Sequence, residues 1–118
     1  MMDRLDPNRW RDVCAEDELA AGEMVNMDIG RHSILLTRTP KGISALQNVC
    51  PHEHCYLHLG TIEDGVIVCA GHQWRFDAST GNGIRPRNAK LSCYDVCVRD
   101  GRIRVAVPAP RRQAQRDA

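Results

Sequence analysis

Two short stretches carry the residues whose types and spacing suggest chemistry. The first is NVCPHEHCYLHLG at positions 48–60, and the second is VCAGHQWRFDASTG at positions 68–81. Each contains a thiol followed closely by an imidazole, and sixteen residues separate the two pairs. Because both pairs lie in tight, glycine- or proline-containing segments, we expect two loops that together bind one metal centre. The predicted ligands are Cys50, His52, Cys69 and His72.

Two kinds of metal centre take two thiolates and two imidazoles. Structural zinc binds such a set tetrahedrally, but zinc fingers usually group cysteine with cysteine and histidine with histidine. In a Rieske [2Fe–2S] centre two cysteines hold one iron and two histidines hold the other. Mixed Cys–His pairs would then give each iron one ligand from each loop. The spacing favours the iron–sulfur centre, while a zinc-stapled binding module without a redox role remains the alternative, and a zinc protein would be colourless.

The elements that position these loops are predicted to be short β-strands. Alternating and β-rich runs predict strands at 10–13, 24–29, 32–37, 42–49, 61–62, 66–68, 93–99 and 102–107, with one helical turn at 15–22. Glu63-Asp64-Gly65 and Asp100-Gly101 are typical of hairpin turns. In the last hairpin the apolar residues alternate and predict one buried face, made of Tyr94, Val96, Val98, Ile103, Val105 and Val107. The fold class is therefore all-β, a small antiparallel domain.

Bulk properties limit the classes of function. A chain of 118 residues predicts one domain, placed at 1–107, followed by a polar tail at 108–118 that we expect to be disordered. The formal net charge of +1 argues against a nucleic-acid-binding surface. The N-terminal residues show no apolar signal region, and no run approaches a membrane span. We expect a monomeric cytoplasmic protein whose six cysteines do not form a disulfide framework.

The motif C-P-H-x16-C-x-x-H, followed by W-x-F-D-x-x-T-G, resembles the Rieske family from about Trp10 to Val107. Within that family the segments GVIVC, HQWRF, TGNGIRP and LSCYDVCVRDGRIRV are similar to the ferredoxin components of multicomponent diiron monooxygenases of the toluene-4-monooxygenase type. The resemblance implies stacked β-sheets with a cluster-binding subdomain made of two loops. It also implies that Cys50 and Cys69 ligate the iron that stays ferric, and that His52 and His72 ligate the iron that is reduced.

The same resemblance implies a function. The chain would be a one-electron carrier between an NADH-dependent flavin and iron–sulfur reductase and a diiron hydroxylase that oxidises an aromatic or alkene substrate. The alternative acceptor is a Rieske-type aromatic-ring dioxygenase. The chain would not be an enzyme itself, because four protein ligands leave the irons no open position for substrate. Small and apolar residues around the cluster are expected to form the docking surface, namely Pro51, Gly71, Trp74 and Pro86.

Residues near the ligands refine this prediction. High-potential members of the family carry a serine and a tyrosine two and four positions after the second histidine, and their hydroxyls donate hydrogen bonds. Trp74 and Phe76 occupy those positions here and have no hydroxyl. We therefore expect a low potential, near the −150 mV end of the range, about −150 to +300 mV, that Rieske centres span.

The remaining cysteines and histidines are predicted to be bystanders. Cys55 occupies the position of a loop cysteine that is disulfide-bonded in high-potential members, but Gly71 replaces its partner, so we expect Cys55 to pack without a disulfide. His54 is predicted to be solvent-exposed, while His58 is left open between an exposed rim residue and a residue that contacts a partner or has a local electrostatic effect on the cluster. Cys14 is expected to be buried. The thiols that remain, expected to be half-exposed and without function, are Cys93 and Cys97.

Overall fold

The computed structural model describes residues 10–51, 55–71 and 73–107. Within these residues the chain is built almost entirely from strands, with two short 310 helices, η2 (Glu16–Glu18) and η3 (Leu57–Leu59). No helix of the described part is long and apolar enough to cross a membrane. The predicted tail at 108–118 lies outside the described residues. In chain order the strands are β1 (Trp10–Ala15), β2 (Met24–Ile29), β3 (His32–Thr39), β4 (Gly42–Gln47), β5 (Thr61–Glu63), β6 (Val66–Val68), β7 (Arg75–Asp77), β8 (Gly83–Arg85), β9 (Cys93–Arg99) and β10 (Arg102–Ala106).

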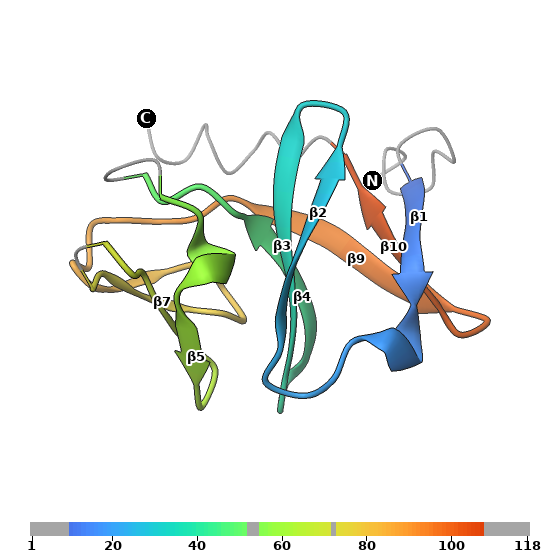
Figure 1. The fold of residues 1–118 in the computed structure, drawn as a ribbon, viewed down its shortest axis with the longest axis horizontal. Coiled ribbons are helices and arrows are strands. Elements are labelled where there is room, and N and C mark those ends of the chain that lie inside the picture. Colours follow the sequence, from blue (N-terminus) through green and yellow to red (C-terminus); the bar gives the residue numbers. More distant parts are fainter. Residues whose placement is uncertain (1–9, 52–54, 72, 108–118) are drawn as a thin grey trace.

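The strands form two antiparallel sheets, which confirms the predicted fold class. The larger sheet has the order β1-β10-β9-β4-β3-β2, and the smaller has the order β5-β6-β7-β8. Figure 1 shows the smaller sheet beside the larger one, at the end opposite β1. All four strands of the smaller sheet are inserted between β4 and β9, and both predicted metal-binding loops belong to this insertion.

The insertion begins and ends at neighbouring points of the large sheet. Gln47, the last residue of β4, donates its N–H to the Ser92 carbonyl at 2.8 Å. Ser92, just before β9, donates its N–H to the Gln47 side chain at 2.7 Å. Next to them, Leu46 and Cys93 are paired across β4 and β9. The two chain crossings into the segment with the predicted metal-binding loops are thus joined by hydrogen bonds in both directions.

Strands β3 and β4 are buried on both faces. Leu35 is paired with Leu46, and Leu36 with Ala45, and because successive side chains point to opposite faces of a sheet, the two pairs enter different cores. Leu35 and Leu46 join the core beneath the small sheet. Leu36 and Ala45 join the core on the other face of the large sheet. These two strands are a wall shared by both cores.

The second core confirms part of the predicted last hairpin. Ile103 and Val105 are fully buried, and Tyr94 and Val96 pack against the same cluster. The prediction for Val98 was wrong, since 41% of its surface is exposed. Strand β9 pairs with β4 only near its start, so within the described residues Val98 lies where β9 has become an edge of the sheet on that side. Cys14 is buried in this core, as expected.

Local boundaries differ from the predictions in a few places. The helical turn expected over 15–22 is limited to η2, because Leu19 is already extended and buried. The three-residue strands β7 and β8 were not predicted. Both predicted hairpin turns are present, and Asp64-Gly65 and Asp100-Gly101 all have positive φ, the combination that a two-residue type I′ turn requires.

Candidate metal centre

The two predicted metal-binding loops are closed in the same way. Cys50, just after β4, donates its N–H to the carbonyl of Cys55 at 2.8 Å. Cys69, just after β6, donates its N–H to the carbonyl of Trp74, also at 2.8 Å. In both loops the acceptor lies five positions after the cysteine, so each cysteine closes the base of its own loop and its Cα is fixed by the neighbouring strand.

Both cysteine side chains enter the same core. Cys50 is 1% exposed and Cys69 is 2% exposed, and both belong to the cluster beneath the small sheet, together with Leu57, Ile67 and Phe76. The structure therefore brings the two predicted thiolate ligands into one apolar, water-poor environment.

The predicted imidazole ligands, His52 and His72, lie outside the described residues, as does His54. Within the described part no group of three or more histidine, cysteine or carboxylate side chains is arranged to hold a metal ion, which is the expected result when half of a four-ligand set is not among them. The full ligand set thus stays a prediction.

A buried asparagine anchors the first loop. Asn48 is fully buried and its carbonyl accepts the N–H of Leu57 at 2.6 Å. Its side-chain Oδ1 accepts the N–H of His58 at 2.9 Å, and its Nδ2 lies 3.0 Å from Asn26 Oδ1 and 3.2 Å from Ser33 Oγ. The end of the loop is therefore attached to β2 and β3 through one side chain.

The same network fixes the state of His58. Because Asn48 Oδ1 accepts the His58 N–H, the amide nitrogen must face the ring, and Asn48 Nδ2 lies 2.8 Å from His58 Nδ1. An amide nitrogen only donates, so Nδ1 is the acceptor and the ring hydrogen is on Nε2. His58 is half-buried and holds the loop through this network, while the roles left open for it from the sequence stay predictions. The only sequence signal for this network was the asparagine two positions before the first predicted ligand. The spacing of cysteines and histidines says nothing about the role of that asparagine.

Cys55 packs against the core, as predicted, and none of the chain's cysteines is in a disulfide. A Cβ built on Gly71 would lie 3.0 Å from Cys55 Sγ and 3.8 Å from Cys69 Sγ. The two loops therefore approach each other at Gly71, where the glycine leaves room beside both sulfurs. Cys93 and Cys97 are half-buried, as expected. Burial raises the pKa of Cys93, whose thiol donates to the Thr80 carbonyl at 3.0 Å.

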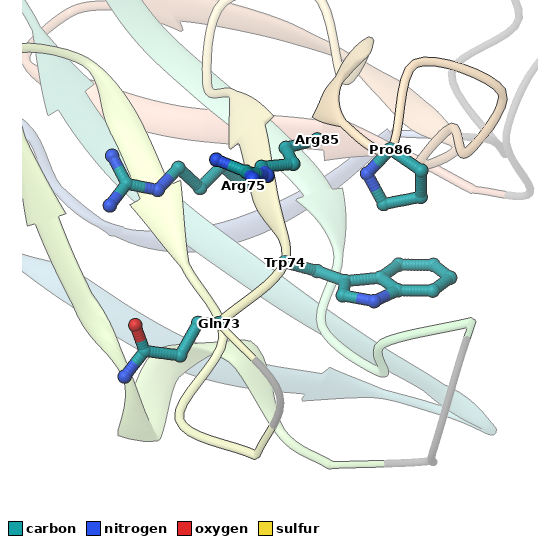
Figure 2. A pocket seen from close by; sticks show the side chains of 5 residues that line it. All are labelled: Gln73, Trp74, Arg75, Arg85 and Pro86. Atoms are coloured by element: carbon teal, nitrogen blue, oxygen red, sulfur yellow. The ribbon is translucent and has the colours of Figure 1, made fainter.

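Trp74 and Phe76 continue the second loop into β7. Phe76 is fully buried, and Trp74 packs against the same core, with 6.4 Å between the two ring centroids. Trp74 also lines a hollow of about 490 Å³ together with Gln73, Arg75, Arg85 and Pro86, shown in Figure 2. Trp74 therefore packs against the core and also borders the surface hollow, and the docking role expected for it stays a prediction.

The predicted docking residues do not all share this hollow. Trp74 and Pro86 line it, while Pro51 and Gly71 are exposed elsewhere on the two loops. Sequence reasoning missed two exposed apolar residues after the first loop, Leu59 at 67% and Tyr56 at 48% exposure. The sequence signal that could have identified them is the presence of large apolar side chains in a loop segment next to predicted ligands.

Comparison with known proteins is consistent with this arrangement. The family model described as the Rieske [2Fe-2S] domain matches residues 9–95. The chain belongs to the Rieske [2Fe–2S] family. It is 37% identical over 108 residues to the ferredoxin component of the alkene monooxygenase system of Xanthobacter autotrophicus (strain ATCC BAA-1158 / Py2), a match that covers 90% of this chain and 88% of that protein.

Solved structures of Rieske proteins have the same fold. The ferredoxin of carbazole 1,9a-dioxygenase from Nocardioides aromaticivorans IC177 superposes with a TM-score of 0.77 at 29% identity, covering 82% of this chain and 96% of that one. A chain in the complex of reduced oxygenase and oxidized ferredoxin of carbazole 1,9a-dioxygenase gives 0.80 at 26% identity, covering 86% and 96%. This Rieske protein is an electron carrier of the ferredoxin type, a component of an oxygenase system.

The described residues fit the cofactor of the family. A Rieske centre needs two thiolates, from two loops, at one site. Cys50 and Cys69 meet this need, since they are buried in one core at the bases of two loops closed by equivalent hydrogen bonds. Among the described residues, Phe76 and Leu57 of the same core lie beside them and carry no hydroxyl.

Proposed function

We propose that this Rieske ferredoxin delivers single electrons to the diiron hydroxylase of a multicomponent alkene or aromatic monooxygenase. The donor in this proposal is an NADH-dependent flavin and iron–sulfur reductase, and the compartment is the cytoplasm, where NADH is available. The observation that carries the proposal is the relation to an alkene monooxygenase ferredoxin over nearly the whole of both chains.

Cys50, His52, Cys69 and His72 are the proposed ligands. A bound [2Fe–2S] cluster supplies reversible one-electron chemistry without breaking bonds. This chain's own residues hold both thiolates in an apolar core. The backbone N–H groups of Cys50 and Cys69 close the two loops that carry the histidines. Because neither Trp74 nor Phe76 carries a hydroxyl, we propose a low potential, near about −150 mV.

The first test is a redox titration of the purified protein followed by EPR. A reduced-state signal of mixed sulfur and nitrogen ligation with a low midpoint supports the proposal, and a midpoint above zero contradicts the argument from Trp74 and Phe76. Intact protein with zinc in place of iron, and no signal at any potential, would overturn the ligand assignment. Replacing His52 or His72 by alanine should remove one of the two imidazole ligands and so reduce the nitrogen contribution to the signal.

The runner-up acceptor is a Rieske-type aromatic-ring dioxygenase, which the structural likeness to carbazole 1,9a-dioxygenase ferredoxins favours. Reconstitution separates the two. The reduced protein is offered to the oxygenase component of the Xanthobacter alkene monooxygenase and, in parallel, to that of a carbazole 1,9a-dioxygenase. Faster oxidation by the first supports the proposal, and faster oxidation by the second replaces it with the runner-up.

A further inference from the structure

Two arginines stand directly opposite each other at the hollow beside the second metal-binding loop. Arg75 on β7 and Arg85 on β8 are cross-strand partners, and both are exposed. Figure 2 shows both side chains extending the same way from the small sheet, with Trp74 and Pro86 forming the other side of the hollow. Like charges directly opposite on a sheet destabilise the fold, so this pair costs stability in the isolated protein.

Nothing in the described part of the chain neutralises this pair. Arg75 and Arg85 make no ion pair or side-chain hydrogen bond there, whereas Arg38 and Arg102 elsewhere are paired with carboxylates. From position 67 to 94 the only acidic residue is Asp77. Its Oδ1 accepts the N–H and the hydroxyl of Ser79, at 2.8 and 2.7 Å. These hydrogen bonds lower the Asp77 pKa.

The local charge is therefore positive although the chain as a whole is close to neutral. Besides the pair, the same segment carries Arg87 and Lys90, and both are exposed. The hollow lies next to the second metal-binding loop, because Trp74 is the residue whose carbonyl closes the loop of Cys69. A positive, concave surface with an aromatic wall thus borders the metal-binding loops.

We propose that the oxygenase presents a protruding carboxylate side chain that enters this hollow and binds both guanidinium groups. Arginine matches a carboxylate through two parallel N–H donors, and the apolar stem of the entering side chain would lie against Trp74 and Pro86. The inference rests on the proposed function and adds the chemistry of the partner's face. We assign the hollow to the oxygenase because a related ferredoxin forms a complex with its oxygenase.

The test uses charge reversal and ionic strength. Reduced wild-type protein and the variant Arg75→Glu/Arg85→Glu are mixed with the oxygenase component of the Xanthobacter alkene monooxygenase, and the second-order rate of oxidation is measured at low and high salt. The matched control is Arg99→Glu, an exposed arginine at the end of β9, and Figure 1 shows the turn between β9 and β10 far from the small sheet. Circular dichroism and the EPR signal verify that each variant is folded and contains its cluster. If the double reversal does not fold, the milder variant Arg75→Gln/Arg85→Gln takes its place.

We expect the double reversal to slow oxidation about tenfold or more at low salt, since electrostatic steering changes association rates by about 10 to 10³. In about 1 M salt, where the Debye length is about 3 Å, the difference should vanish. The control should differ from wild type by less than about twofold. A rate unchanged in the double variant overturns the inference, and so does a loss confined to reduction of the protein by the reductase component.

Failure of the proposed function has a different signature. If wild-type protein does not reduce the alkene monooxygenase oxygenase at any salt concentration, the acceptor assignment fails. The same variants are then measured with the carbazole 1,9a-dioxygenase oxygenase, where the expected salt-dependent loss supports the arginine pair and an unchanged rate overturns it.

Discussion

Replacing Asn48 by alanine should destabilise the protein far more than its size suggests. The change removes a fully buried side chain whose amide oxygen accepts the His58 N–H and whose amide nitrogen donates to Asn26 and His58. Leaving one buried N–H without an acceptor costs about 1–3 kcal/mol, and each lost hydrogen bond adds about 1 kcal/mol. Together these effects predict a loss of about 3 kcal/mol in the free energy of unfolding.

That loss is measurable. It corresponds to roughly a 150-fold shift in the unfolding equilibrium, and for a domain of this size to a fall in Tm of about 12 °C. Thermal unfolding followed by circular dichroism, with visible absorbance of the cluster as a second signal, is the assay. Asn82→Ala is the matched control, because it makes the same chemical change on an exposed side chain and should cost less than about 0.5 kcal/mol. A loss below about 1 kcal/mol in Asn48→Ala would refute the view that this network anchors the first loop.

Further predictions concern the loops and their supports. Gly71→Cys should form a disulfide with Cys55, because the new Cβ would lie 3.0 Å from that sulfur, about the spacing that disulfide geometry gives between a Cβ and the far sulfur. Alkylation of the unfolded, unreduced variant should then label one thiol fewer than the six of wild type, and labelling of one thiol more than wild type would contradict it. Asp77→Asn should cost about 1 kcal/mol at pH 7 by weakening the bonds from Ser79. Those bonds hold the folded pKa of Asp77 below its ordinary value of 3.8, so wild type loses the benefit as the pH falls below about 4, and urea unfolding should show the two proteins converging there. Gly60→Ala should cost about 2–3 kcal/mol, because its Cβ would meet a backbone carbonyl of β6; unchanged stability to urea would show that the loop shifts freely.

The sequence predicted the parts of the fold that depend on local pattern. Alternation located the long strands and the two hairpin turns, since burial of one face and positive φ at Asp-Gly leave direct marks on residue type. It failed at Val98, because exposure there depends on where a neighbouring strand stops pairing. The three-residue strands β7 and β8 are too short to show a period and exist through pairing with β6.

The candidate site likewise has parts that the sequence predicted and parts that only the folded chain reveals. Spacing of cysteine and histidine identified the two loops, and the structure places both cysteines in one core. The link from Asn48 to His58 joins residues ten positions apart, and only the folded backbone brings them together. The arginine pair was equally hidden, because its two members are neighbours only through the register of β7 and β8.

The hydrogen-bonded junction of Gln47 and Ser92 makes the metal-bearing segment a removable module in the topological sense. Its two ends leave the large sheet side by side, so a short turn from β4 to β9 would close the remaining sheet without stretching it. What prevents a simple deletion is the shared wall, since Leu35 and Leu46 would lose their cover and face water. A redesigned scaffold with polar residues at those two positions would show whether the larger sheet folds alone, and whether the smaller module can be transplanted into another protein as a self-contained redox unit.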